Sequence, residues 1–405
     1  MRELIYLEKL LDGVEIEWLP IGEIADIYGG LTGKTKADFE NGNAKYVSYK
    51  NIFSNINIDE PPTDFVNVKN GERQHAVRYG DVLFTGSSET AEEAGISSAI
   101  TSHFDEPVYL NSFSFGIRFN QKVKIKPEFS KYLFRTNLMR AEIAKTASGV
   151  TRFNISKSRF KKVLIPVISP ENPEKSLAIQ SEIVRILDRF TALTAELTAE
   201  LTMRKNQYNY YRDKLLSFEE GGVEWKTLGE IVKMRAGQHI SARNIVDGKE
   251  GDFVYPCFGG NGIRGYVKEK SHDGEHLLIG RQGALCGNVQ RMKGQFYATE
   301  HAVVVSAMQG IDIDWAFHML TTMNLNQYAS KSAQPGLAVG KLQELKLLVP
   351  SIERQKYIAK MLDKFDTLTG SITEGLPREI ELRQKQYEYY RDLLFSFPRP
   401  ETASN

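Results

Sequence analysis

The chain has 405 residues, 41% of them hydrophobic and 25% charged, which is typical of a globular protein with two or three domains. The 52 Lys and Arg residues nearly balance 51 Asp and Glu residues, and the formal net charge of +1 excludes a protein that coats nucleic acid through bulk charge. Only Cys257 and Cys286 are present, and no apolar run reaches the ~18 residues of a membrane-spanning helix, so we expect no disulfides, no membrane partner and a cytoplasmic location.

Residues 14–165 form a first block with strand and turn signals. Short alternating runs of apolar and polar residues (KYVSY, FVNV, DVLF and SFSFGIRF) are separated by Gly, Asn and Pro clusters. One helix is expected near the end of the block, over residues 128–147. The stretch YGGLTGKT (28–35) lacks the first glycine of a phosphate-binding loop, so we interpret it as a loop that exposes Lys34 and Lys36.

Residues 180–218 predict a long helix, because apolar residues recur at alternating spacings of four and three along it. This is the seam of a coiled coil, and such a helix of about forty residues would be roughly 60 Å long at ~1.5 Å per residue. The predicted seam residues of this first helical unit are Ile183, Ile186, Phe190, Leu193, Tyr208 and Tyr211.

Residues 223–350 form a second block of the same kind, with strand signals HLLI, FYA and AVVV and one helix expected over 312–330. Its GGNGIRG stretch (259–265) has the glycine spacing of a dinucleotide-binding loop but no helix after it, which favours a tight turn that approaches a ligand closely. Zinc-ligand spacing and an adenosylmethionine motif are absent from the sequence, and Glu344 and Lys346 fit a closing strand better than half of a nuclease site. We therefore expect no catalytic site in this chain.

A second helical unit then repeats the first. QYNYYRDKLLSF (207–218) returns as QYEYYRDLLFSF (386–397) with nine of twelve positions identical, and QSEIVRILDRFTALT returns upstream as QKYIAKMLDKFDTLT. Pro377 should interrupt this helix unless it lies in the first turn of a new one. The predicted seam residues of the second helical unit are Ile358, Met361, Phe365, Leu368, Tyr387 and Tyr390.

The repeat organises the whole chain. EWLPIGEI (17–24) matches EWKTLGEI (224–231), and GDVLFTGSS (80–88) resembles GEHLLIGRQ (274–282). The sequence predicts an α+β protein with a pseudo-twofold internal repeat, in which two long helices pair antiparallel as a coiled coil and join two similar domains. The expected segments are a first domain (1–165), a first helical region (166–220), a second domain (221–350) and a second helical region (351–405).

Local basic stretches are the main functional signal. Residues 148–162 hold five cations and no anion, and further arginines lie in the glycine-rich loops of the second block. Arginine suits guanine, and asparagine or glutamine suits adenine, because each makes two hydrogen bonds to its base edge. A solvated basic face is the alternative interpretation.

The chain resembles the specificity subunits of type I restriction–modification enzymes. The resemblance rests on MLDKFDTLT, ITEGLPREIELRQKQYEYYRDLLFSF and RKNQYNYYRDKLLSF, and on CFGGNGIRGYV and IGRQGALCGNV in the second domain. It implies that each domain reads one half of a bipartite, asymmetric site in double-stranded DNA and that the helices set the spacer. It also implies two methylation (M) subunits and two restriction (R) subunits as partners, which would use S-adenosylmethionine, ATP and Mg²⁺, so that this subunit is not catalytic on its own.

Within that interpretation, residues in glycine-punctuated loops are expected to face DNA. These are Lys34, Lys36, Arg152, Asn154, Asn261, Arg264, Arg281 and Gln282. The alternative function is a helical scaffold or adaptor that does not bind nucleic acid.

Overall fold

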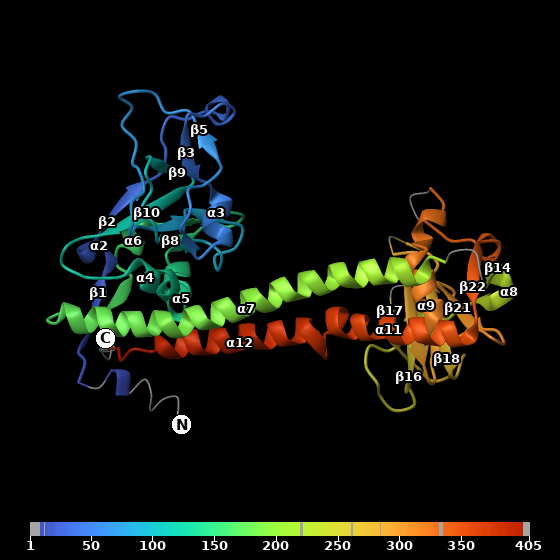
Figure 1. Ribbon diagram of the computed structural model, residues 1–405. Coiled ribbons are helices and arrows are strands. Elements are labelled where there is room, and N and C mark those ends of the chain that lie inside the picture. Colours follow the sequence, from blue (N-terminus) through green and yellow to red (C-terminus); the bar gives the residue numbers. More distant parts are fainter. Residues whose placement is uncertain are drawn as a thin grey trace. The chain divides into compact units, whose positions relative to one another are not determined.

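The computed structural model describes residues 9–11, 13–218, 222–260, 262–283, 285–331 and 335–399 (Figure 1). The chain divides into two compact units, Met1–Glu196 with Ile380–Asn405, and Leu197–Glu379. This division falls inside the long helices and not at the segment ends that the repeat suggests. Among the described helices, none is both long and apolar enough to cross a membrane.

In the first domain, which belongs to the first unit, the first strand pairs with the last. β1 (Ile16–Pro20) pairs antiparallel with β13 (Leu164–Ile168). The main sheet has the order β2 (Ala25–Gly29), β10 (Ser114–Phe119), β6 (Val82–Thr85), β8 (Ser97–Ile100), β4 (Asn57–Ile58). Two three-stranded sheets complete it, β5 (Phe65–Val66) with β3 (Ala44–Val47) and β9 (Val108–Leu110), and β11 (Ala147–Ser148) with β12 (Phe153–Ile155) and β7 (Ser87–Ser88). Its short helices are α2 (Ile21–Ile24), η1 (Lys36–Phe39), α3 (Tyr49–Ser54) and α6 (Lys157–Phe160).

The second domain, in the second unit, repeats this plan. β14 (Val223–Thr227) pairs antiparallel with β22 (Lys346–Pro350), so Lys346 begins the expected closing strand. The main sheet has the order β15 (Val232–Ala236), β21 (Ala302–Ala307), β18 (Glu275–Gly280), β19 (Val289–Lys293). A second sheet joins β17 (Gly262–Val267), β16 (Tyr255–Gly259) and β20 (Tyr297–Ala298). The helices are α8 (Leu228–Ile231), η2 (Ala242–Asn244), α9 (Ile313–Thr322), η3 (Leu325–Tyr328) and α10 (Val339–Gln343).

The two main sheets share strand order and direction, which confirms the internal repeat in the α+β fold. β10 pairs antiparallel with both β2 and β6, and β21 pairs antiparallel with both β15 and β18. Ser114 lies opposite Thr85, as Ala302 lies opposite Gly280. The structural match is therefore shifted by one residue from the sequence match of GDVLFTGSS with GEHLLIGRQ.

The helix expected over 128–147 is broken, which corrects the sequence-based prediction. It forms α4 (Pro127–Leu133) and α5 (Asn137–Ala144), because Thr136 adopts an extended backbone and its hydroxyl accepts a hydrogen bond from the N–H of Met139 at 3.3 Å. The helix expected over 312–330 likewise ends as α9 at Thr322, before a left-handed Asn324 and the short η3.

The first helical unit is one continuous helix, α7 (Pro173–Leu216) of 44 residues, whereas the second is split into α11 (Ile352–Gly370) and α12 (Gly375–Leu394). Gly375 explains the break, because its φ is +78° and a Cβ there would lie 2.4 Å from the carbonyl oxygen of Thr367. Pro377 lies in the first turn of α12, the second of the two outcomes that the sequence left open.

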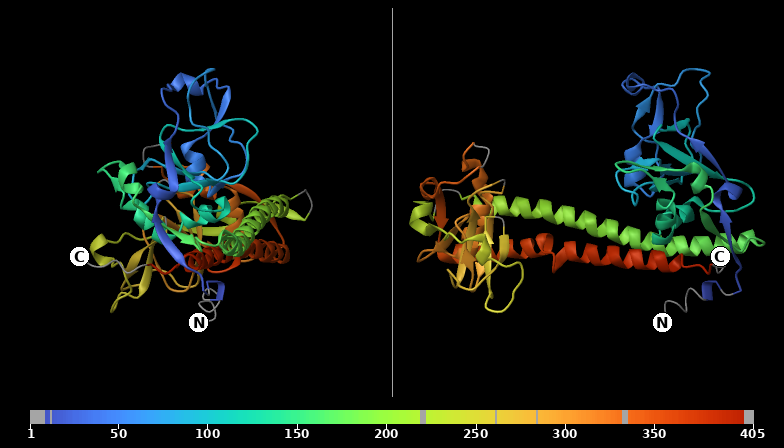
Figure 2. Two further views of the ribbon diagram at one scale, coloured as in Figure 1. Left: turned by 90° about the vertical axis from the view of Figure 1, so that its left-hand side faces the viewer. Right: turned by 180° about the vertical axis from the view of Figure 1, so that it is seen from behind.

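Within each unit, a domain packs on segments of both helical units. The first core combines the main sheet with Ile183 and Leu187 of α7, with Leu394 of α12 and with Phe395 directly after it. Figure 2 shows the first domain beside the early part of α7 and the late part of α12. In the same unit the rings of Phe190 and Tyr390 stack at 5.2 Å.

The second core contains Ile358 and Leu362 of α11 together with Leu215 near the end of α7. In that unit Tyr211 stacks on Phe365 at 5.8 Å, and Tyr208 lies 6.1 Å from the same ring. Early residues of α7 thus meet late residues of α12, and late residues of α7 meet α11, so the predicted antiparallel pairing is confirmed.

The predicted seam is less continuous than expected. Ile183 and Ile358 are buried against the domains, and Tyr387 lies 6.3 Å from Tyr132 of the first domain. Ile186, Met361 and Leu368 are half-buried. Leu193 and Tyr211 remain 37% and 39% exposed, although Tyr211 stacks on Phe365 of the other helical unit.

Candidate functional site

In the first domain, three chain segments meet where β6 ends and β10 begins. The N–H of Gly86 donates to the carbonyl of Phe113 at 2.8 Å, and the N–H of Ile155 donates to the carbonyl of Gly86 at 2.9 Å. We call this place the first loop junction; it comprises residues 86–88, 111–113 and 152–155. β7 and β12 pair across it, with Ser87 opposite Asn154.

The second domain repeats these backbone contacts. The N–H of Arg281 donates to the carbonyl of His301 at 2.9 Å, and the N–H of Leu337 donates to the carbonyl of Arg281 at 2.9 Å. We call this place the second loop junction; it comprises residues 281–283, 299–301 and 335–337. Gln282 is bridged to Gly336 here, as Ser87 is to Asn154 in the first domain.

A glycine turn supports each junction at an equivalent position. The N–H of Gly95 donates to the carbonyl of Thr85 at 3.1 Å, and the N–H of Gly287 donates to that of Gly280 at 2.7 Å. Both glycines have positive φ, and a Cβ would lie 2.5 Å from the side chain of Ile143 at Gly95 and 2.4 Å from a backbone nitrogen at Gly287. The backbone of the junction is therefore fixed in both domains.

Aromatic rings and one arginine occupy the first loop junction. Arg152 donates from Nε to the hydroxyl of Ser87 at 3.0 Å, and its guanidinium lies 5.9 Å from the ring centre of Phe113. Tyr49 stacks on Phe53 at 6.0 Å and donates from its hydroxyl to the carbonyl of Ser87 at 3.0 Å. These side chains line a cleft of about 550 Å³.

A polar network of different residues occupies the second loop junction. His301 donates from Nδ1 to the side-chain oxygen of Gln282 at 2.8 Å, and Nδ1 of His239 lies 2.9 Å from a carboxylate oxygen of Glu300. Burial raises the pKa of Glu300, but the hydrogen bond from His239 and the nearby histidines outweigh burial, so that the pKa lies below its usual value. The carboxylate is thus charged at neutral pH.

Four of the predicted DNA-facing residues gather at these junctions, Arg152 and Asn154 at the first and Arg281 and Gln282 at the second. Arg264 projects from β17 beside Gly259, where a Cβ would lie 2.8 Å from its Cδ. Asn261 lies outside the described residues. Lys36 is exposed at the start of η1, away from the junction segments in the sequence. The DNA contacts of these residues stay predictions.

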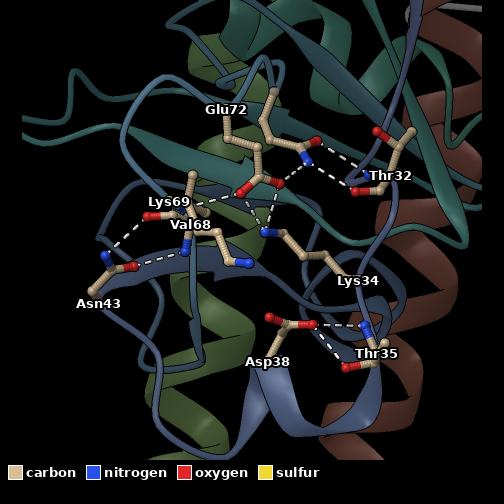
Figure 3. A network of polar contacts seen from close by, with 9 residues as sticks. Thr32, Lys34, Thr35, Asp38, Asn43, Val68, Lys69 and Glu72 are labelled. Atoms are coloured by element: carbon tan, nitrogen blue, oxygen red, sulfur yellow. Dashed lines mark hydrogen bonds and ion pairs between the residues drawn. The ribbon is translucent and has the colours of Figure 1, made fainter.

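Lys34 requires a correction, because it is not the exposed cation that we expected. Its amine lies 2.6 Å and 2.7 Å from the two carboxylate oxygens of Glu72, and its side chain is only 5% exposed (Figure 3). The hydrogen bonds from Lys34 and Gln74 lower the pKa of Glu72 to about 2. Gln74 also bonds the backbone of Thr32 at both N–H and carbonyl. Lys34 therefore links the loop around residues 32–35 to the loop around residues 72–74.

Sequence reasoning missed several residues that lie in the loop junctions or line the cleft beside the first one. Phe113, Tyr49 and Phe53 belong to separate segments that only the fold brings together, and Glu300 and His301 lie at the matching position of the second domain. The available signal was the GDVLF and HLLI match, since both runs end at a junction. A comparison of the residues that directly follow these two runs would have pointed to the two loop junctions.

Two histidines and the two cysteines of the second domain, which are residue types that can bind metal ions, have other contacts. His272 stacks on Phe296 at 5.4 Å, and His276 bonds the hydroxyl of Ser306 at 2.9 Å. Cys257 and Cys286 are free and buried. No group of three or more potential ligands for a metal ion occurs within the described ranges.

Comparison with known sequences gives matches over most of the chain. The family model of the type I restriction modification DNA specificity domain matches twice, at residues 14–203 and 220–382. The type I restriction enzyme EcoprrI specificity subunit of Escherichia coli is 59% identical over 386 residues, which are 92% of this chain and 93% of that protein. A second type I restriction enzyme specificity subunit of Escherichia coli is 40% identical over 442 residues and covers 100% of both chains.

Comparison with solved structures gives the same fold at low sequence identity. The S subunit of a type I restriction–modification system from M. genitalium matches with a TM-score of 0.57 at 16% identity, over 96% of this chain and 98% of that chain. A chain from a structural study of complex assembly and conformational transition of the type I R-M system matches with a TM-score of 0.59 at 16% identity, over 94% and 97%.

Proposed function

Because this chain belongs to the specificity subunits of type I restriction–modification enzymes, which supply DNA sequence recognition, we propose that each of its loop junctions reads one half of a two-part DNA target. One observation carries this proposal. The junctions share their backbone hydrogen bonds but display unlike side chains, Phe113 and Arg152 in one and His301 and Gln282 in the other. Two junctions with the same backbone arrangement but different side chains suit a target whose two halves differ in sequence.

The paired helices act as the spacer in this proposal. A continuous helix of 44 residues is ~66 Å long at ~1.5 Å per residue, which exceeds the roughly 34–36 Å between half-sites that are one DNA turn apart. The stacked pair of Phe190 and Tyr390, and that of Tyr211 and Phe365, support a fixed register of α7 against α12 and α11.

The catalytic partners are proposed to bind twice, since the helical unit occurs twice. Tyr210 and its repeat counterpart Tyr389 are 60% and 57% exposed, which offers equivalent contacts to two methylation subunits. Two restriction subunits complete the enzyme in this proposal. Methyl transfer from S-adenosylmethionine, and DNA cleavage with ATP and Mg²⁺, then belong to those partners and not to this chain.

The test uses the methyltransferase assembled from this chain and its methylation subunits. Replacing Gln282 and His301 by alanine together should relax one half of the methylated motif, as read by single-molecule sequencing of host DNA. Gln295→Ala, an exposed amide of the second domain outside the junction, is the control and should leave the motif intact. Equal relaxation of both halves would refute the assignment. An assembled complex without salt-dependent DNA retention would favour the scaffold function instead.

A further inference from the structure

The cleft of the first loop junction carries both signs of charge. Arg152 lines it together with Glu89 and Glu93, and Glu93 accepts a hydrogen bond from the hydroxyl of Ser88 at 3.1 Å. A site for DNA phosphates gains from cations alone, because carboxylates repel the backbone. Mixed charge instead suits base edges, where donors and acceptors alternate. The side chains of the cleft therefore suit contacts with base edges inside a DNA groove better than contacts with phosphates.

Arg152 is held in a fixed orientation. Its Nε donates a hydrogen bond to the hydroxyl of Ser87, and its guanidinium lies over the ring of Phe113. Its two terminal nitrogens have no hydrogen-bond partner in the described part of the chain. Two parallel donors from a fixed guanidinium match O6 and N7 of guanine. Because Ser87 and Phe113 already restrict the side chain, little rotamer freedom remains to be lost on binding.

The rim of the cleft is apolar and accessible. Phe113 is 64% exposed and Phe53 is 38% exposed. Exposed rings at a groove contact the C5 edge of a pyrimidine without a hydrogen bond. Glu89 is exposed beside them and accepts no hydrogen bond within the described ranges, so its carboxylate is available to the amino group of cytosine.

We propose that the first loop junction recognises a G·C base pair in the major groove, with Arg152 on guanine and Glu89 on the N4 amino group of the paired cytosine. Phe113 orients the guanidinium and contacts the neighbouring pyrimidine edge. This inference rests on the proposed function, in which the first domain reads one half-site. It adds the base pair that is read and the residues that read it.

The experiment compares Arg152→Gln, Arg152→Lys and Glu89→Gln in the assembled methyltransferase, with Arg189→Gln on the exposed face of α7 as the matched control. Methylated motifs are mapped by single-molecule sequencing, and affinity is measured on cognate and mismatched duplexes at several salt concentrations. Both Arg152 variants should lower discrimination at one G·C position of one half-site by about 5- to 150-fold, because lysine keeps the charge but cannot form the bidentate contact. Glu89→Gln should relax the same base pair, and Arg189→Gln should change nothing.

Two outcomes would overturn the inference. If Arg152→Lys equals the unmodified chain, and Arg152→Gln weakens binding to every sequence with a salt slope lower by about one, Arg152 contacts phosphate. If the Arg152 and Glu89 variants leave motif and affinity unchanged while the Gln282 and His301 variant relaxes its half-site, the cleft is not the reader but the proposed function stands. If neither junction affects the motif, the proposed function itself fails.

Discussion

The side-chain oxygen of Gln180 on α7 accepts a hydrogen bond from the backbone N–H of Lys126 at 2.8 Å, just before α4 begins. Its amide nitrogen donates to the carbonyl of Lys124 at 2.8 Å. Gln355, its counterpart in the second helical unit, accepts from the backbone N–H of Asp312 at 2.9 Å, just before α9. The duplicated glutamine thus attaches each domain to its own helix through the same kind of contact.

Replacing Gln180 or Gln355 by alanine should lower the free energy of unfolding by ~1–3 kcal/mol, because each change removes a buried amide that hydrogen-bonds at least two backbone groups. Chemical denaturation followed by circular dichroism measures the loss. Gln384→Ala on the exposed face of α12 is the control, and its effect should stay within ~0.5 kcal/mol. A Gln180 variant as stable as its control would contradict this role.

We expect His318 to make the stability of the second domain depend on pH. Burial lowers the pKa of its imidazole, although the nearby carboxylate of Asp363, 2.8 Å from Nε2, opposes this. Since the folded pKa lies below the unfolded value of about 6.5, the unfolded chain binds more protons, and stability present above pH ~6.5 falls as the pH drops below it.

The matched variant is His318→Gln, which keeps an N–H donor for Asp363 but does not titrate. The fall in melting temperature between pH 7 and pH 5 should be smaller in this variant than in the unmodified chain. Calorimetry at both pH values measures the difference, and all other titrating groups are common to the two proteins. An identical fall in both would show that His318 does not control the response.

The break between α11 and α12 depends on Gly375. Gly375→Ala should cost ~1–3 kcal/mol of stability, because the positive φ is strained for alanine and its Cβ would meet the carbonyl of Thr367. Gly370→Ala is the control, since a Cβ there meets only ordinary contact with Asp366 at 3.8 Å, and helix propensity favours alanine by up to ~1 kcal/mol. Thermal denaturation of both variants is the measurement. Equal stability of the two would contradict the geometric explanation.

The spacer role predicts a change in target geometry. Four residues inserted within 195–202 of α7, with a matching insertion at 379–380 of α12, lengthen each helix by ~6 Å. At ~3.4 Å per base pair, the gap between half-sites should grow by about one or two base pairs, as mapped in the methylated motif. A motif with an unchanged gap would remove the spacer interpretation.

Much of the fold was predictable because the repeat constrains it. The match of EWLPIGEI with EWKTLGEI predicted two equivalent domains, and both stretches begin with a strand that closes its domain. Pro377 indicated either an interruption of the second helical unit or the first turn of a new helix, and the structure has the new helix, α12. The break at Thr136 was not predictable from periodicity, since the flanking residues continue a helical pattern and only the capping hydroxyl ends it.

The candidate site was predictable only in part. Arg152, Asn154, Arg281 and Gln282 were found from loop composition, and they lie at equivalent junctions. Lys34 was misjudged, because its partner Glu72 is distant in sequence and only the fold brings the two together. Residue type and local spacing identify side chains that are suited to bind DNA. The tertiary structure decides which of these side chains already bond to another residue of the chain.

The most direct test of two independent readers is an exchange of domains. Residues 14–168 are replaced by residues 223–350, so that both attachment points carry the second domain, and the motif methylated by the assembled complex is determined by single-molecule sequencing. Because both domains attach to the helices through equivalent contacts, the account predicts a symmetrical motif made of two copies of the second half-site around a gap. A motif that stays asymmetric would contradict it.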